Sequence, residues 1–326
     1  MISRDELRRN KTLAVDRAGG ALIGHAIGDS FGDAARTPEN HFLFGITMDF
    51  REGPAPGTDD TEFALMTART LIDCGGRLSD EAVLAAWRRH VLPLQELHRG
   101  GASEREAAQN IRRGVLPPLS GMYNAYCLSD GAAMRVCPAG IVAAGDPAEA
   151  CRLAEIDARI SHWRDGIWGA QAVAAGIAVA MAGGTVGEVF HSALECTPPD
   201  SWTRHNLVRT REIIAETGSI EGAWGPLHAA LWSEYKAVAP EAVAEAFAVF
   251  QLVEGDFRRG IIYAGNWGRD SDTIAAIVGS LCGAMCGRSA IPSAWIDKVR
   301  IAAGACLPFT KGLDLFTVAG ELAQLI

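Results

Sequence analysis

The sequence predicts an all-α protein folded as a single multi-helix domain. Apolar residues recur at helical spacing along most of the chain, and no segment shows the alternation typical of strands. Glycine is abundant (36) and tyrosine scarce (4), a composition that suits closely packed helices better than sheets. No linker, internal repeat or low-complexity segment divides the 326 residues, so we expect one domain over residues 1–326.

Capping residues, apolar spacing and glycine or proline breaks predict the individual helices. The first covers residues 5–28. From Gly28 to Gly57 glycine and proline interrupt the chain, which predicts a long loop of the kind that often carries function. A helix over 60–73 follows, with Thr58 or Asp59 as its N-cap. After it we expect helices at 79–90, 103–113, 147–160, 165–181, 186–194, 203–216, 219–231, 240–252, 257–265, 270–286, 292–301 and 312–326, with an irregular segment at 114–131.

Charge and hydropathy limit the classes of partner. A net charge of −9 disfavours binding to a nucleic-acid backbone or an anionic membrane. The N-terminus alternates charges and has no apolar run typical of a signal peptide. The longest apolar stretch, Gly166 to Gly184, is rich in alanine and glycine and contains Gln171, which predicts a buried helix rather than a membrane span. We therefore expect a cytoplasmic protein with no nucleic-acid and no membrane partner.

The eight cysteines are scattered and form no CxxC pair. The closest two, Cys282 and Cys286, stand at helical spacing inside an apolar run. This pattern favours core thiols in a reducing compartment over disulfides or zinc ligands.

Two acidic clusters stand out. Thr58-Asp59-Asp60-Thr61 follows a proline- and glycine-rich stretch and opens a helix, and Asp270-Ser271-Asp272-Thr273 opens a strongly apolar one. Either cluster alone could be an ordinary helix cap. Together they supply carboxylate and hydroxyl oxygens, which are the ligands that hard cations prefer. Because the second helix is so apolar, its carboxylates should lie at the floor of a pocket, and we expect one metal site assembled by folding.

Several motifs, in order, give the chain a specific family resemblance. It resembles the ADP-ribosylglycohydrolases in a helix-and-loop signature, a TDDT motif, a GAAMR-type motif, a short histidine motif and a GDTDT-type motif before an IAAI-x-G run. These motifs correspond here to Gly20–Asp29, Thr58–Thr61, Gly131–Arg135, Ser161-His162 and Arg269–Thr273.

The resemblance implies an all-α fold with a central cleft for two Mg²⁺ ions, Mn²⁺ being an alternative. It implies hydrolysis at C1″ of a terminal ribose, with Asp59, Asp60 and Asp272 as catalytic residues. The implied metal ligands are Thr58, Asp59, Asp60, Asp270, Asp272 and Thr273. The implied substrate-binding residues are Ser129, Asp130, Gly131, Met134 and His162. For His162 the alternative is a histidine hydrogen-bonded within the core at a helix entry.

Two departures from the family pattern affect the substrate. Relatives carry a glycine-rich turn before GAAMR, whereas this chain reads Tyr126–Gly131 and places Asp130 where a phosphate would be expected. A carboxylate beside a diphosphate is unfavourable without a cation, although it could accept hydrogen bonds from a neutral ribose or base.

The second departure concerns the general acid. Many relatives carry a glutamate after the first motif, and direct counting puts Arg36 at or near its position. Asp33 and Glu39 are the nearest carboxylates, so the general acid stays unassigned. The region that follows contains four arginines, which could contact phosphates or could simply belong to solvated helix faces. They are Arg99, Arg105, Arg112 and Arg113.

The expected function is Mg²⁺-dependent hydrolysis of a bond at C1 of a ribose. The leading substrate is an ADP-ribosylated protein side chain or a related conjugate. One alternative is a hydrolase of ribosylated small molecules such as nucleosides, which the Asp130 departure motivates. Another is a relative that binds ADP-ribose without catalysis, against which the complete set of expected ligands argues.

Overall fold

The chain is helical throughout the part that the structure describes. The structure, a computed structural model, describes residues 1–33, 36, 45–53 and 55–326. Within these ranges extended pairing is limited to isolated bridges, Ser129 with Val238 and Ile301 with Asp314. The prediction of an all-α fold is therefore confirmed.

The helices are α1 (Arg4–Arg9), α2 (Lys11–Gly32), α4 (Asp59–Asp73), α5 (Asp80–His90), α6 (Ala102–Arg112), α7 (Leu119–Met122), η2 (Ala133–Arg135), α8 (Cys137–Val142), α9 (Pro147–Ala158), α10 (Asp165–Met181), α11 (Val186–Glu195), α12 (Trp202–Thr217), α13 (Ile220–Leu231), α14 (Ala239–Leu252), α15 (Phe257–Gly265), α16 (Ser271–Cys286), η3 (Arg288–Ala290), α17 (Ser293–Val299), η4 (Pro308–Thr310) and α18 (Leu315–Ala323).

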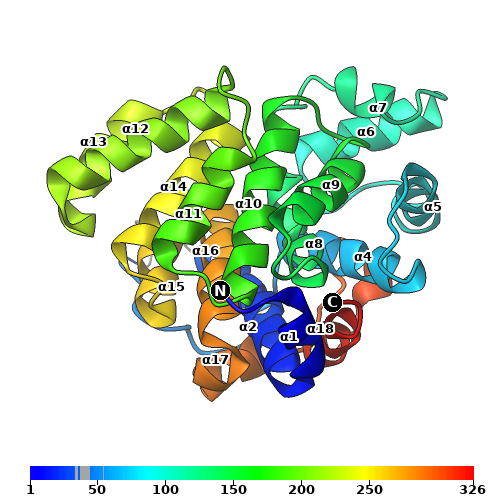
Figure 1. Cartoon of the computed structure of the whole chain (residues 1–326). Helices are drawn as coiled ribbons and strands as arrows, with labels where there is room; N and C mark the ends of the chain where they lie inside the picture. Colours follow the sequence, from blue (N-terminus) through cyan, green and yellow to red (C-terminus); the bar gives the residue numbers. More distant parts are fainter. Residues whose placement is uncertain (34–35, 37–44, 54) are drawn as a thin grey trace.

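Helices α2 and α16 pack against each other at the centre of the molecule (Figure 1). They run antiparallel and approach so closely that glycines are required between them. A Cβ on Gly24 would lie 2.2 Å from the carbonyl oxygen of Gly279, and one on Gly28 would lie 1.9 Å from that of Ala275. Because these neighbours are backbone atoms, they cannot rotate away as a side chain could. The end of α2 is thereby fixed beside the beginning of α16.

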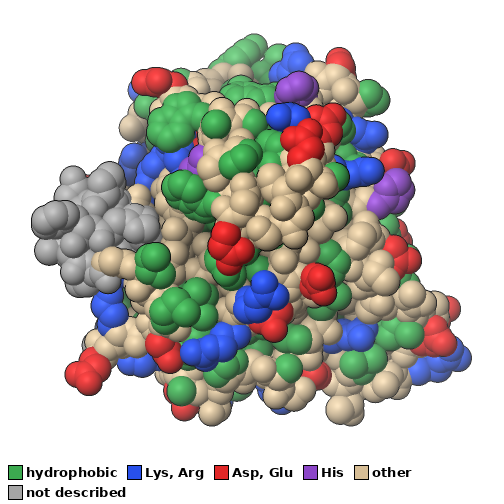
Figure 2. All heavy atoms as spheres, turned by 90° about the vertical axis from the view of Figure 1, so that its left-hand side faces the viewer, with side chains coloured by type: hydrophobic (Ala, Val, Ile, Leu, Met, Phe, Trp, Pro, Cys, Tyr) green, Lys and Arg blue, Asp and Glu red, His purple; other side chains and the backbone are tan. Residues whose placement is uncertain are grey.

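The remaining helices surround this pair and share one hydrophobic core. Helix α10 is buried along nearly its whole length, in agreement with the prediction of a buried helix for this stretch. No helix among the described residues is both long enough and apolar enough to span a membrane. On the face that Figure 2 shows, exposed hydrophobic side chains lie in small groups between charged ones.

The prediction of one helix over residues 5–28 was wrong in two respects. It divides at Asn10, whose side chain accepts a hydrogen bond from the backbone N–H of Leu13 and caps α2. It also continues past Gly28 to Gly32. Glycine at these positions reflects the close contact with α16, whereas its local sequence suggested a helix end. The expected loop therefore starts later, and residues 34–35 and 37–44 of it lie outside the described residues. Helices α7 and α8 were also not predicted, and α7 lies within residues 114–131, which were expected to be irregular.

The cysteine prediction was wrong for one pair. Cys151 and Cys196 form a disulfide that joins α9 to the residue after α11. Both helices pack against α10, which brings together residues that are 45 positions apart in the sequence. The other six cysteines are free thiols, as predicted.

Candidate active site

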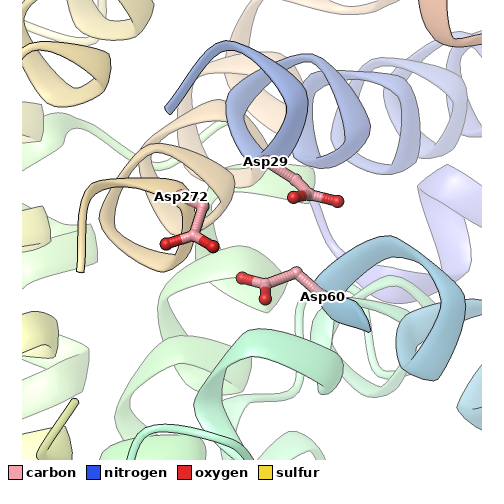
Figure 3. A group of neighbouring side chains, drawn as sticks. All are labelled: Asp29, Asp60 and Asp272. Atoms are coloured by element: carbon pink, nitrogen blue, oxygen red, sulfur yellow. The ribbon is translucent and has the colours of Figure 1, made fainter. Parts of the chain in front are cut away.

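Three buried carboxylates converge where α2, α4 and α16 meet. Asp29, Asp60 and Asp272 each offer an oxygen, and these oxygens all lie within 4.8 Å of one another. Figure 3 shows Asp60 and Asp272 facing each other, with Asp29 beside them. All three side chains are almost completely buried.

Local structure explains how each carboxylate reaches this point. Asp29 lies in the last turn of α2, and its Oδ2 accepts hydrogen bonds from the backbone N–H groups of Thr58 (2.7 Å) and Thr61 (3.1 Å). Asp29 thus fixes the start of α4. Asp60 and Asp272 lie in the first turns of α4 and α16, where the helix dipole favours a negative charge.

The six predicted metal-ligand residues lie together around these carboxylates. The hydroxyl of Thr273 donates to Asp60 Oδ2 (2.9 Å), and that of Thr58 donates to Asp60 Oδ1 (3.3 Å). Asp59 and Asp270 line the adjoining pocket. The prediction that the two sequence clusters form one site in the fold therefore agrees with their placement. Asp29 belongs to the same group of carboxylates, here called the acidic cluster, which consists of Asp29, Asp59, Asp60, Asp270 and Asp272. It was not predicted as a member, because it was expected at the edge of a loop.

The oxygens of this acidic cluster are poorly satisfied. Among the described residues none donates a hydrogen bond to Oδ1 of Asp29, Asp59 or Asp270, or to either oxygen of Asp272. Burial raises the pKa of Asp59 to about 7. Burial and then the charge of Asp272 raise the pKa of Asp60 well above its ordinary value. Buried carboxylates at this density require a compensating cation. A set of hard oxygen donors with unused lone pairs fits Mg²⁺.

Two basic side chains compensate part of this charge. Nη1 of Arg36 lies 2.6 Å from Asp272 Oδ2, outside hydrogen-bonding geometry, and its Nε lies 3.5 Å from Asp270 Oδ1. Nζ of Lys236 lies 3.4 Å from the same Asp270 oxygen. Burial alone would lower the pKa of Arg36, but Asp272 and then Asp270 raise it above its ordinary value. The residue at the position of the expected glutamate is thus a counter-ion of the cluster.

A pocket of about 290 Å³ opens above the acidic cluster. Asp59, Asp60, Asp270 and Thr273 contribute to its lining. The lining also includes four of the five predicted substrate-binding residues, which are Ser129, Asp130, Gly131 and Met134. Arg99, Arg105 and Tyr235 line it as well.

The structure corrects the expected position of His162. This histidine is fully buried and does not line the pocket. Its Nε2 lies 2.9 Å from the hydroxyl of Ser129, and its Nδ1 lies 2.8 Å from that of Ser161. His162 therefore supports the pocket wall from behind, as in the alternative of a core histidine.

His162 belongs to a closed ring of hydrogen bonds, here called the Arg135 ring. Arg135 donates to Glu104 Oε1 (2.9 Å) and to the hydroxyl of Ser161 (2.9 Å). Ser129 donates to Ser103 (2.8 Å), which in turn donates to Glu104 Oε2 (2.8 Å). The ring consists of Arg135, Ser161, His162, Ser129, Ser103 and Glu104.

Along the path from Arg135 through Ser161, His162, Ser129 and Ser103 to Glu104, every donor points the same way if the imidazole of His162 is neutral and carries its proton on Nε2. Burial, and then the nearby charge of Arg135, lower the pKa of His162 well below its ordinary value. Arg135 also donates to Asp157 Oδ2 (2.6 Å), so the guanidinium is held by two buried carboxylates.

The remaining residues considered from the sequence, as a general acid or for phosphate contacts, lie at different places. Asp33 forms an ion pair with Arg99 at 2.5 Å. Glu39 lies outside the described residues. Arg112 donates to backbone carbonyls at the end of α5, and Arg113 follows the last residue of α6. Of the four arginines considered for phosphate contacts, Arg99 and Arg105 line the pocket.

The chain is similar to known proteins over nearly its whole length. The sequence model of the ADP-ribosylglycohydrolases matches residues 9–325. The chain is 26% identical to the ADP-ribosylarginine hydrolase Tri1 of Pseudomonas putida, over 88% of this chain and 75% of that protein. It is 25% identical to the ADP-ribosyl-[dinitrogen reductase] glycohydrolase of Rhodospirillum rubrum, over 87% of this chain and 90% of that protein.

A solved structure supports the fold. The structure of an ADP-ribosylglycohydrolase-related protein complex superposes with a TM-score of 0.66 and 22% sequence identity, covering 96% of this chain and 99% of that one. The family match and the relatives named as hydrolases confirm the prediction of a glycosidic-bond hydrolase. The chain belongs to the ADP-ribosylglycohydrolase family.

Proposed function

We propose that this protein is a Mg²⁺-dependent hydrolase that cleaves the bond at C1 of a ribose and removes ADP-ribose from a modified protein side chain. The observation that carries the proposal is the acidic cluster, in which several buried oxygens lack partners and which adjoins a pocket large enough for a ribose. The relatives named for ADP-ribosylarginine and for ADP-ribosylated dinitrogen reductase support a modified protein as substrate.

Two Mg²⁺ ions, or Mn²⁺ in their place, would be held by oxygens of the acidic cluster. The proposed ligands are Thr58, Asp59, Asp60, Asp270, Asp272 and Thr273, and Asp29 joins them through its unpartnered Oδ1. Divalent ions at such a site polarise ribose oxygens and lower the pKa of a bound water.

The residues of the chain orient the reactants. We assign catalytic roles to Asp59, Asp60 and Asp272. Asp59 and Asp60 line the pocket, where a carboxylate can accept a hydrogen bond from a ribose hydroxyl or from the attacking water, and Asp272 adds two unpartnered oxygens beside Asp60. The hydroxyl of Thr273 holds Asp60 in position. As the glycosidic bond breaks, positive charge develops on the ribose, and the negative charge of the cluster favours that state. Ser129 and Met134 also line the pocket.

A second candidate function is hydrolysis of a phosphate-free riboside. It is favoured by the carboxylate of Asp130 in the pocket wall, where a diphosphate would be repelled.

Release of ADP-ribose from an arginine-ADP-ribosylated protein, assayed with and without Mg²⁺ after treatment with a chelator, tests the proposal. We expect release with Mg²⁺, no release without it, and no release by Asp60→Asn. Glu234→Gln is the matched control, because Glu234 is exposed and does not line the pocket. Release of base from nucleosides without release of ADP-ribose would replace the first function by the second. Binding of ADP-ribose without turnover of either substrate would indicate a non-catalytic relative.

A further inference from the structure

The carboxylate of Asp130 stands out within the pocket wall. Its residue is 3% exposed, yet its Oδ2 accepts no hydrogen bond from any residue that the structure describes. It lines the same pocket as Asp270 and Thr273. A buried acceptor without a partner is unfavourable unless a ligand supplies a donor.

The backbone around Asp130 offers no donors to an anion. The N–H of Ser129 donates to the carbonyl of Tyr126 (2.9 Å), and that of Asp130 donates to the carbonyl of Ala237 (3.1 Å). The N–H of Gly131 donates to the hydroxyl of Ser129 (3.3 Å). Anion-binding turns work through N–H groups that point freely at the ligand. Each N–H of the Ser129–Gly131 turn is already used within the protein.

The charged side chains behind this turn are already paired with each other, since Arg135 donates to Glu104 Oε1 and to the carbonyl of Gly131. A Cβ on Gly131 would lie 2.5 Å from Glu104 Oε1, so the backbone of the turn rests directly against that carboxylate. Of the basic residues of the pocket, Arg36 and Lys236 form ion pairs with Asp270 rather than with Asp130. A phosphate placed at this turn would meet the Asp130 carboxylate directly, and that carboxylate forms no ion pair among the described residues.

We propose that Asp130 is a specificity-determining residue, whose carboxylate binds a hydroxyl or amine group of the substrate and excludes a phosphate from the Ser129–Gly131 turn. This inference rests on the proposed function for the ribosyl part of the ligand. The substrate class that fits is a riboside whose group at this wall is an uncharged or cationic hydrogen-bond donor. Any phosphate of a larger substrate must lie elsewhere in the pocket, on the side of Arg99 and Arg105.

Calorimetric titration with two probes, adenosine and ADP-ribose, tests this assignment in the presence of Mg²⁺. Asp130→Asn keeps the size of the side chain but removes its charge. We expect adenosine to bind about tenfold more weakly to this variant, the loss of one charge-assisted hydrogen bond. We expect ADP-ribose to bind at least as tightly as to the wild type. The ratio of the two affinities therefore changes by about tenfold or more. Glu234→Gln removes an exposed charge near the pocket and should leave the ratio unchanged.

Three results would overturn the proposal. In the first, Asp130→Asn changes the ratio of the adenosine and ADP-ribose affinities no more than Glu234→Gln does. In the second, Asp130→Asn loses ADP-ribose binding. In the third, the wild type does not bind adenosine. Asp130→Ser serves as a second neutral variant, and circular dichroism verifies that each variant is folded. The proposed function fails on different evidence, namely a wild type that hydrolyses no ribosyl bond with Mg²⁺, so the two failures can be told apart.

Discussion

The acidic cluster and the Arg135 ring are both buried and polar, and both contribute residues to the lining of the same pocket, but their hydrogen bonding differs. In the Arg135 ring every member is hydrogen-bonded to its neighbours, and the guanidinium is balanced by Glu104 and Asp157. In the acidic cluster several carboxylate oxygens have no partner within the described chain. A buried polar group that is satisfied stabilises the fold, whereas a group of unsatisfied ones calls for a ligand.

This comparison explains why two sequence motifs, one containing His162 and one containing Arg135, have a structural role here. Arg135 and His162 belong to conspicuous motifs, yet neither lines the pocket. They hold Ser129 in place, so they act on the substrate only through the wall that they support. The acidic cluster, by contrast, leaves its oxygens free to bind.

The largest effect is expected from breaking the Arg135 ring. Arg135→Met removes the positively charged member of the ring and leaves Glu104 and Asp157 buried without their ion-pair partner. Such a loss lowers the free energy of unfolding by about 3–5 kcal/mol. Chemical denaturation with and without Mg²⁺ measures it. An Arg135→Met protein as stable as the wild type would contradict the structural role.

A smaller, pH-dependent effect is expected at Glu245, an unpartnered carboxylate outside the pocket. Both of its oxygens lack hydrogen bonds among the described residues. Burial, and then the charge of Glu241, raise the pKa of Glu245 from 4.5 to about 8. The folded state therefore holds this proton more tightly than the unfolded state does. The associated stability is fully present below pH 4.5 and is lost as the pH rises through about 8.

Within this window each pH unit removes about 1.4 kcal/mol of stability. Glu245→Gln should abolish that slope, so the variant gains on the wild type as the pH rises from 5 to 8, which thermal unfolding at several pH values measures. Identical pH profiles for the two proteins would show that the Glu245 carboxyl finds a partner.

The smallest effect is expected at Arg36, the counter-ion of the acidic cluster. Arg36→Gln removes the charge beside Asp272 and Asp270. Without divalent ions the variant should lose about 1.5–3 kcal/mol of stability, the range for a charge-assisted contact. With Mg²⁺ the loss should shrink, because the ions compensate the same carboxylates. Thermal unfolding in chelator and in Mg²⁺ separates the two conditions, and an equal loss in both would argue against a shared counter-ion role.

The all-α fold could be predicted from the sequence, and so could a single site that contains the residues of the two acidic motifs. The hydroxyls and carboxylates of Thr58–Asp60 and Asp270–Thr273 could be recognised because their residue types match cation ligands and because both begin apolar helices. The position of each depends mainly on its own helix start, which local sequence encodes well.

Other features depended on contacts between distant segments. Asp29 was missed because the glycines around it suggested a loop, whereas they allow α2 to approach α16. The Cys151–Cys196 disulfide joins α9 to the residue after α11, and both helices pack against α10. The position of His162 behind Ser129 follows from the Arg135 ring, whose members come from four separate segments of the chain. No local pattern carries this information.

The most direct test of the account is the thermal unfolding of the wild type and of Asp272→Asn during titration with Mg²⁺. The account predicts that Mg²⁺ raises the Tm of the wild type in a saturable way, by an amount equivalent to about 2.7 kcal/mol at a hundredfold excess over Kd. Asp272→Asn should show no such rise, while remaining folded in the absence of metal. A wild type whose Tm does not respond to Mg²⁺, or an Asp272→Asn variant that responds equally, would contradict a metal site at the acidic cluster.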